Sequence, residues 1–577
     1  MRPAAKVLLV GWDGAGWNQI NPLLDAGAMP ATAGIVENGV MGELASVPVL
    51  CSALLWSTAA TGQGADRHGV LDSFEPDPRT GGVRPVTRAS LRAVPVWDIL
   101  AHEGLCCQTV GWPATHPAGP PAISVSDGFA HGVPHSIYPE TLESTLGPLR
   151  FRPQEWTGDD LRLFVPGFER IDQDNDTRLA RLAGILAEAA GIHAAATTLL
   201  ERGDWDFTAV RFPTLAQARE IFPAGTDEVY RDVVSGIHRY LDLFLARLRH
   251  LAGPDAMVIL VSECSPRARG ILCAAGKGIA ADELTFGASL TDLAPTILGL
   301  FDFAPAPGMA GTAIRDICPG VPARRVNAAN CVPPPAPVTP PEIERDLREL
   351  AELGYRDRIA ADLLAEAEQG RKRREFNLAR VLLAQARAAE AVTPLEKLAA
   401  EEPGNCELRL YLGHAYFQSG RVAECRRLCE ALLADWPDSP LGPLARAHLA
   451  MAEGKYREAR AHLEEGREAY GVMAALDAAI GEVYLHIGNW RDAAEAFRSA
   501  IAGDSTIPAA HQGLAQALFE QQLYQESAEA ALDAIGLRYD APAPHRILGR
   551  SLRALGREEA AEAAFATAQR VSGPRAV

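Results

Sequence analysis

A period of 34 residues is the feature that most constrains how this chain can fold. Small residues recur at this spacing, at Gly413, Ala447, Gly481, Ala515 and Gly549. A second set follows seven positions later, at Gly420, Gly454, Gly488, Gln522 and Gly556. A small residue lets two helices pack closely, and a glycine supplies the turn between them. The period therefore predicts stacked helix pairs in an all-α solenoid.

Supporting positions follow the same period, with Leu-Gly-x-x-Tyr at 412–416 and Ile-Gly-x-x-Tyr at 480–484. This pattern resembles the tetratricopeptide repeat. Five units are in register, and a degenerate sixth unit at about 372–405 precedes them, so we expect about six repeats over 372–571. The resemblance implies a concave groove that binds a protein or peptide partner. A helical array that only supports the first part of the chain is the alternative.

The first part of the chain alternates short apolar runs with longer amphipathic stretches. The expected strands are 7–10, 107–110, 207–212 and 257–261, and the expected helices include 89–103, 174–202 and 227–251. A run that is apolar at every position suits a strand covered on both faces. The alternation predicts an α/β domain, a mostly parallel sheet between two layers of helices, over 1–318.

Proline-rich sequence separates the two parts. The segment 319–341 contains repeated prolines, which exclude helix and central strand and predict a stiff, extended linker. The following segment, 342–371, is expected to form connecting helices, the first of them amphipathic over 342–355. The solenoid of 372–571 then follows.

Composition excludes several classes of protein. The formal net charge of -18 argues against a nucleic-acid partner, which requires a basic face. None of the ten cysteines forms a Cys-x-x-Cys pair, which argues against a zinc ribbon. No apolar run approaches the roughly 20 residues of a membrane span, and no signal peptide precedes the first strand. We therefore expect a cytoplasmic protein without a membrane span.

The first expected strand ends in Gly-Trp-Asp-Gly at 11–14, which places the carboxylate of Asp13 at its carboxyl end. In open α/β sheets, ligands bind at this edge. The alternative is that Asp13 only caps the next helix.

Several motifs follow Gly-Trp-Asp-Gly: Pro-Val-Leu-Cys-Ser at 48–52, Thr61-Gly62, His68-Gly69, Trp-Pro-Ala-Thr-His-Pro at 112–117 and Thr-Asp-Leu-Ala-Pro-Thr at 291–296. Together they resemble the type I phosphodiesterase/nucleotide pyrophosphatase branch of the alkaline phosphatase superfamily. The resemblance covers residues 6 to about 315 and implies the alkaline-phosphatase-like fold.

The resemblance also implies a mechanism. Two zinc ions would hold the attacking and leaving oxygens of a displacement at phosphorus, and a Ser or Thr at a helix start would attack. The family places this nucleophile nine residues before the Thr of the Thr-Gly pair, which is Ser52 here. Ser52 could equally be a helix N-cap. Asp13 matches the first metal ligand.

The remaining ligand positions depart from the family pattern. Leu215 stands where an Asp is expected, and Arg219 stands where the following His is expected. Glu263 and Cys264 replace the Asp-His pair after the strand at 257–261, and the segment 265–279 contains no His. Leu cannot bind a cation, and Arg would repel one. Asp13 and Glu263 are then residual metal positions that are insufficient for a dizinc site.

The replacements add positive charge at Arg219, with Arg267 and Arg269 near it in sequence. Guanidinium groups bind phosphate, so a metal-free pocket between Asp13, Ser52 and Arg219 could hold an anion. Alternatively, Arg219 pairs with Asp13 or Glu263 and fills the space of the metal.

We therefore expect a catalytically degenerate phosphodiesterase-like protein, a pseudoenzyme without a metal cofactor, that acts as a scaffold or regulator through its repeats. The first alternative is an active metal-dependent phosphodiesterase, or phosphoryl- or sulfuryl-ester hydrolase, with two zinc ions and Ser52 as the nucleophile. A metal-independent transferase that uses Ser52 is a further alternative.

Overall fold

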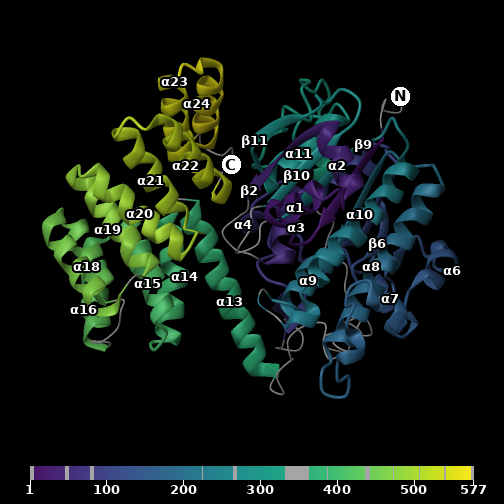
Figure 1. Ribbon diagram of the computed structural model, residues 1–577, viewed down its shortest axis with the longest axis horizontal. Helices are drawn as coiled ribbons and strands as arrows, with labels where there is room; N and C mark the ends of the chain where they lie inside the picture. Colours follow the sequence, from purple (N-terminus) through teal and green to yellow (C-terminus); the bar gives the residue numbers. More distant parts are fainter. Residues whose placement is uncertain are drawn as a thin grey trace. The chain divides into compact units, whose positions relative to one another are not determined.

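The chain forms two compact units, a sheet covered by helices and a run of paired helices (Figure 1). The computed structural model describes residues 6–45, 51–77, 83–223, 225, 227–263, 270–331, 363–385, 387–435, 442–471, 473–505, 507–538 and 541–572. Each unit is treated on its own below.

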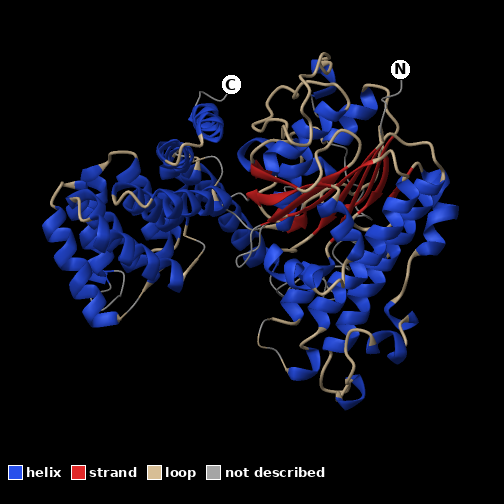
Figure 2. Cartoon of the chain, turned by 45° about the horizontal axis from the view of Figure 1, so that its top comes forward, coloured by secondary structure: helices blue, strands red, loops and turns tan. Residues whose placement is uncertain are grey.

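The first unit is built on a nine-stranded sheet, shown in red in Figure 2, with the order β11-β2-β10-β9-β1-β8-β5-β6-β7. The strands are β1 Val7–Trp12, β2 Gly39–Ala45, β5 Cys107–Trp112, β6 Ile123–Ser126, β7 Ile137–Tyr138, β8 Phe207–Phe212, β9 Met257–Ser262, β10 Gly270–Ala275 and β11 Glu283–Ser289. The central strand β1 runs parallel to both β8 and β9, and β8, β5 and β6 continue in parallel. β10 and β2 pair antiparallel. The predicted mostly parallel α/β sheet is confirmed.

Helices cover both faces of this sheet. Leu8, Val10 and Trp12 of β1 share a core with helices α8 (Arg178–Glu201) and α10 (Val233–Ala252). Val7 and Leu9 of β1 point to the opposite face of the sheet and are also buried. On this face, α3 (Ser52–Thr61), α5 (Val96–His102) and α11 (Leu290–Leu300) contact one another. The remaining α-helices are α1 Trp17–Asp25, α2 Pro30–Glu37, α4 Ala65–His68, α6 Glu143–Leu146, α7 Gly158–Arg162 and α9 Thr214–Ile221. A separate ribbon pairs β3 (Phe74–Pro76) with β4 (Val83–Pro85).

Three expected helices are shorter than the sequence pattern suggests. The stretch 89–103 contains a 3₁₀ turn at Arg88–Ser90 and then α5, because Pro95 lies in an extended conformation and starts the helix. α8 begins at Arg178 instead of 174, after a turn in which Asp172 accepts the backbone N–H of Asp174. α10 begins at Val233, after a 3₁₀ turn at Glu228–Tyr230.

Helix α8 is long and apolar enough to cross a membrane by length and composition alone. However, 72% of its apolar window is buried inside the first unit. Its side chains pack against α10 and the sheet, so α8 is a core helix of this unit.

The described part of the segment predicted as an extended linker, 319–331, packs on the first unit. Arg324 forms a β-bridge with Phe303, and the backbone N–H of Asn327 donates to Glu103. A 3₁₀ turn follows at Ala328–Cys331. Over these residues the chain therefore differs from the predicted linker, while 332–341 and the amphipathic helix expected at 342–355 lie outside the described residues.

The second unit is a run of helix pairs, and the predicted solenoid is confirmed. Its helices are α13 Leu363–Ala384, α14 Ala388–Glu401, α15 Cys406–Gln418, α16 Val422–Asp435, α17 Gly442–Ala452, α18 Tyr456–Tyr470, α19 Ala474–Ile487, α20 Trp490–Gly503, α21 Pro508–Glu520, α22 Tyr524–Leu537, α23 Pro542–Ala554 and α24 Glu558–Ser572. The first set of small residues does allow close packing within the pairs. A Cβ atom at Gly481 would lie 2.7 Å from the ring of Phe497, and one at Gly549 would lie 2.7 Å from the ring of Phe565.

The second set of small residues occupies the turn between the two helices of each pair. Gly420, Gly454, Gly488 and Gly556 have φ angles of 73°, 74°, 77° and 76°. Gln522 has the same conformation, with φ of 64°. In this left-handed region a side chain clashes with the backbone, which costs roughly 1 kcal/mol. Gln522 is therefore a strained position in an otherwise regular array.

We predict that Gln522→Gly stabilises the solenoid by about 1 kcal/mol, because glycine adopts this conformation without the clash. The reverse change at the equivalent position, Gly488→Gln, should destabilise it by a similar amount. Urea unfolding of the full chain, followed by helical circular dichroism, measures both. If the two changes had the same sign, the turn conformation would not explain them.

Candidate functional site

The carboxylate of Asp13 lies at the carboxyl ends of the two central parallel strands. Its backbone N–H donates to the carbonyl oxygen of Phe212 at 2.9 Å, which holds the end of β1 against the end of β8. The residue is 1% exposed. The next helix, α1, has Gly16 as its N-cap and no side-chain cap, so the alternative of Asp13 as a capping residue is wrong.

Ser52 contacts Asp13 directly. It is the first residue of α3, and Cys51 holds the N-cap position. The Ser52 hydroxyl donates to Oδ2 of Asp13 at 2.7 Å and makes no cap hydrogen bond. Ser52 is therefore not the N-cap, and its hydroxyl faces Asp13 at the edge of the sheet.

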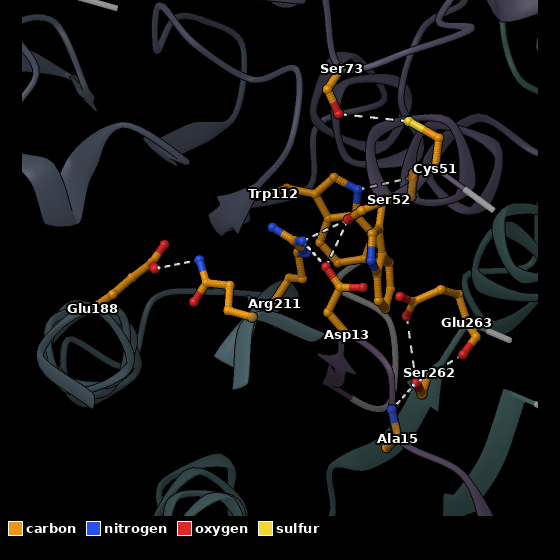
Figure 3. Close-up of polar contacts among 12 residues, drawn as sticks. Asp13, Ala15, Cys51, Ser52, Ser73, Trp112, Glu188, Arg211, Ser262 and Glu263 are labelled. Atoms are coloured by element: carbon orange, nitrogen blue, oxygen red, sulfur yellow. Dashed lines mark hydrogen bonds and ion pairs between the residues drawn. The ribbon is translucent and has the colours of Figure 1, made fainter. Parts of the chain in front are cut away.

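Arg211 joins these two residues. One guanidinium nitrogen, Nη2, donates to Oδ2 of Asp13 and to Oγ of Ser52, the latter at 2.8 Å. The three side chains point toward one another in Figure 3. We call them the Asp13–Ser52–Arg211 triad. Both charged side chains are buried, with exposed fractions of 9% for Arg211 and 2% for Asp13.

Gly11 provides the space that Arg211 occupies. The two residues face each other in the register between β1 and β8. A Cβ atom at Gly11 would lie 3.4 Å from Cγ of Arg211 and 2.6 Å from the ring of Trp56. The guanidinium also lies over that ring, 5.8 Å from its centroid. A side chain at position 11 would therefore displace either the arginine or the tryptophan.

Glu263 lies on the other side of Asp13 in Figure 3. It is buried, and its carboxylate lies 3.5 Å from the hydroxyl of Ser262, which accepts the backbone N–H of Ala15 at 2.8 Å. Oδ1 of Asp13 is buried and accepts no hydrogen bond from a described residue. Cys264, Arg267 and Arg269 lie outside the described residues.

Neither of the two replaced positions on α9 reaches Asp13. Leu215 is fully buried in the apolar core between α8, α10 and the sheet. Arg219 lies in the last turn of α9, and its guanidinium donates to Gln19 of α1. Burial lowers the pKa of Arg219 from its ordinary value. The prediction that Arg219 pairs with Asp13 or Glu263 is wrong. The arginine that pairs with Asp13 is Arg211, on strand β8.

A cavity of about 240 Å³ opens beside the triad. Beyond Asp13, Ser52 and Arg211, its polar lining consists of Ser73, His116, Asp127, His131, Glu188, Gln217 and Glu220. Glu188 accepts from Gln217 at 2.9 Å and lies 3.4 Å from His131. Burial lowers the pKa of His116 to about 4, so its imidazole is neutral at pH 7. Arg219, proposed from the sequence as an anion ligand, is not among the lining residues.

Two further residues of the motif, Thr61 and His68, make hydrogen bonds to neighbouring segments and do not line the cavity. Thr61 donates to the carbonyl of Ser57, and Gly62 ends α3 with φ of 64°. His68 is fully buried, with Nε2 at 3.0 Å from the hydroxyl of Thr58 and Nδ1 at 3.2 Å from the backbone N–H of Val70. The Thr-Gly and His-Gly pairs of the motif are therefore structural.

The described residues do not fit a dizinc centre. Zinc requires three or four nitrogen, sulfur or oxygen ligands around each ion. The described ranges bring together no group of three or more His, Cys, Asp or Glu that could hold a metal ion. Arg211 also places a positive charge directly on Asp13, where a cation would have to bind.

Arg211 is not among the site residues expected from the sequence. The sequence feature that could have identified it is a single charged residue in the otherwise uncharged strand Phe-Thr-Ala-Val-Arg-Phe, one position before the end of the strand. An arginine in a strand buried on both faces needs an anion, and Asp13 ends the neighbouring strand.

Comparison with known families finds one family in the first unit and another in the second unit. Residues 7–264 match the type I phosphodiesterase / nucleotide pyrophosphatase family. Residues 382–449, 444–508 and 513–576 match tetratricopeptide repeat families. No curated protein matches the chain significantly.

Solved structures resemble each part separately. A tetratricopeptide repeat protein of Thermus thermophilus is 20% identical, with a TM-score of 0.27, over 32% of this chain and 98% of its own. MamA is 17% identical, with a TM-score of 0.25, over 28% of this chain and 94% of its own. The phosphonoacetate hydrolase of Sinorhizobium meliloti 1021, solved with phosphonoformate, is 16% identical, with a TM-score of 0.32, over 45% of this chain and 56% of its own.

We predict that Arg211→Met destabilises the first unit by about 3–5 kcal/mol, because it leaves the buried carboxylate of Asp13 without a counter-ion. Adding Asp13→Asn to Arg211→Met should recover most of this loss, because the uncompensated charge is then removed. Urea unfolding of the two variants and of Asp13→Asn alone gives the coupling. Additive losses would contradict an ion pair between these residues.

We predict that the stability of the first unit falls as the pH drops below 6.5. Burial lowers the pKa of His68 from 6.5 to about 3, so over this interval the unfolded state binds a proton that the folded state does not. Burial lowers the pKa values of His116, His193 and His238 to about 4, with the same sign. The pH dependence of the urea midpoint should become shallower in His68→Gln. An unchanged slope would contradict a neutral His68.

Proposed function

Because the chain joins a type I phosphodiesterase/nucleotide pyrophosphatase domain to tetratricopeptide repeats, we propose that it is a catalytically degenerate member of that family. The first unit no longer hydrolyses phosphoesters. The protein acts as a scaffold or regulator through its repeats, which bind a protein or peptide partner.

One observation carries this proposal, the position of Arg211. Its Nη2 atom contacts both the residual metal ligand Asp13 and the nucleophile position Ser52. A guanidinium group has no lone pair to share with a metal and is always protonated. It neutralises Asp13 in the way a metal would, but it provides no open coordination position for substrate or water.

The state of Ser52 supports the same conclusion. Its hydroxyl donates its proton to Asp13 and accepts from Arg211. An activated serine needs a base that can remove this proton near neutral pH. Oδ2 of Asp13, which accepts this hydrogen bond, is at the same time held by the guanidinium of Arg211.

The enzyme alternative keeps one favourable observation. Ser52 lies at the start of a ten-residue helix and opens on a cavity of about 240 Å³, as a nucleophile would. In that case the protein is a metal-dependent phosphodiesterase or related ester hydrolase, with Asp13 and Glu263 among its zinc ligands. Such a site requires Arg211 to move away from Asp13.

The partner belongs to this proposal as well. The net charge of -18 disfavours nucleic acid, so we propose a protein or peptide in the groove of the repeats. We also propose that the protein works in the cytoplasm.

Metal analysis and turnover distinguish the two functions. We expect the purified full chain to carry far less than one zinc ion per chain and to leave a nitrophenyl phosphodiester intact, with or without added zinc. A zinc-dependent phosphodiesterase assayed in parallel is the control. About two zinc ions per chain, with turnover that disappears in Ser52→Ala, would establish the enzyme instead.

A further inference from the structure

A second pocket of the first unit has a volume of about 380 Å³ and shares no lining residue with the cavity beside the triad. Its side chains come from the segment 151–160, from α8 and from α10. On α8, Glu188 lines the cavity beside the triad, whereas Ala190 and Ala194 line the second pocket. At about 100° per residue, these two positions lie roughly 200–240° around the helix from Glu188. Helix α8 therefore separates two different pockets.

Aromatic rings form the walls of this second pocket, which we call the aromatic pocket. The ring centroids of Trp156 and Tyr240 are 6.0 Å apart, and their planes meet at 81°. The centroids of Tyr240 and Phe244 are 4.3 Å apart, and the imidazole of His193 stacks on Phe244 at 3.9 Å. Phe151 lines the pocket at the surface, where it is 43% exposed. Rings at a steep angle form a corner, in which one bound group can contact two of them.

Two carboxylates, Glu155 and Asp160, line the same pocket. Oε2 of Glu155 accepts the backbone N–H of Arg152 at 2.7 Å. Oδ2 of Asp160 accepts the hydroxyl of Thr157 at 2.7 Å and its backbone N–H at 2.9 Å, and the bond from the hydroxyl lowers the pKa of Asp160. Neither carboxylate forms an ion pair with a described residue. Each is held by one oxygen atom and keeps its charge for a ligand.

Positive charge is absent from the described lining of this pocket, which contains no Lys or Arg. Burial lowers the pKa of His193 to about 4, so its imidazole is neutral at pH 7. Burial raises the pKa of Tyr240, so its phenol keeps its proton. Arg247, whose charge also acts on His193, donates to Glu201 at 2.7 Å. The aromatic pocket therefore combines neutral rings with negative charge.

This combination favours a cation without hydrogen-bond donors. The face of an aromatic ring attracts a cation, and the attraction is strongest for Trp. Ring faces offer a metal ion no lone pairs, and the described ranges contain no group of three or more His, Cys, Asp or Glu that could hold one. A primary ammonium has three N–H donors that need acceptors. A quaternary ammonium group has none, and its methyl groups can contact the rings directly.

We propose that the aromatic pocket binds a small molecule with a quaternary ammonium group, which lies against Trp156 and Tyr240 while Glu155 and Asp160 balance its charge. A volume of about 380 Å³ is typical of small-molecule sites and leaves room for a further part of the ligand. This ligand goes beyond the scaffold role proposed above and does not depend on it, because the pocket uses no residue of the triad or of the repeats.

Isothermal titration calorimetry of the full chain, in buffer with a metal chelator, measures this binding. The ligands are choline, its neutral isostere 3,3-dimethylbutan-1-ol, and ethanolamine, which carries a primary ammonium in place of the quaternary one. Flotation with vesicles of phosphatidylcholine or of phosphatidylglycerol measures whether a lipid supplies the head group instead.

Two sets of variants separate the rings from the charges. Tyr240→Leu removes one ring, and Tyr240→Phe is its control because it keeps the ring. Glu155→Gln combined with Asp160→Asn removes both charges and retains an oxygen that accepts from Thr157. Its control is Asp159→Asn, an exposed acid on the same helix that does not line the pocket. Circular dichroism and urea unfolding verify that each variant is folded, and the two exposed acids can be changed without disturbing the core.

We expect choline to bind about tenfold more tightly than ethanolamine or the neutral isostere. Tyr240→Leu should weaken choline binding about tenfold, whereas Tyr240→Phe should bind as the parent does. The double charge variant should weaken it about threefold, because its carboxylates are exposed, and Asp159→Asn should leave it unchanged.

Several results would overturn this proposal. They are no detectable binding of choline, equal affinity for choline and the neutral isostere, or equal affinity for choline and ethanolamine. Full choline affinity in both Tyr240→Leu and the double charge variant would place the binding elsewhere. Binding to phosphatidylcholine vesicles without binding of free choline would assign the pocket to a lipid. The zinc and turnover measurements stay the same in each case, so the two proposals fail separately.

Discussion

The buried ion pair between Asp13 and Arg211 determines what the first unit can do. Both groups lie at the carboxyl edge of the central strands, where this type of sheet binds its ligands. A buried carboxylate is stable only with a compensating charge and satisfied hydrogen bonds. The compensating charge here belongs to the chain itself, because Arg211 extends from the strand next to Asp13. The pair therefore forms between residues of two adjacent strands of the same sheet.

A tethered cation has different consequences from a bound one. A metal ion can exchange its ligands and accept oxygen atoms from a substrate during a reaction. The guanidinium is fixed by its own strand, by the ring of Trp56 and by the space that Gly11 leaves. It can hold Asp13 and Ser52 in place, but it cannot polarise a substrate as a metal does. The guanidinium therefore fixes the geometry around the Ser52 hydroxyl and supplies no metal-like coordination.

The fold follows closely from the sequence, because its signals are local and repeated. The first strand is expected at 7–10 and is found as β1, since its run of apolar residues suits a strand that is covered on both faces. The period of 34 residues predicted the helix pairs even at Gln522, where the residue type does not fit the turn. The packing of the repeat array sets the backbone conformation of Gln522, against the preference of this residue type.

The site was predicted only in part, because a motif gives positions in sequence but no side-chain directions. Asp13 and Ser52 lie together, as the resemblance implied. Arg219 was expected to fill the place of the metal, yet the short helix α9 directs it to Gln19. Arg211 precedes the aligned ligand positions, so comparison with the family motif could not identify it. The pairing of β1 with β8 is what brings it to Asp13.

The described arginines of the two units differ in whether a described acidic side chain pairs with them. Arg211 has its anion within the same sheet, and its hydrogen bonds leave little positive charge for anything else. Arg538 and Arg546 have no acidic partner within the described ranges. Breaking a buried ion pair is strongly destabilising, because it leaves an uncompensated buried charge. By this criterion Arg211 is a stabilising residue of the first unit.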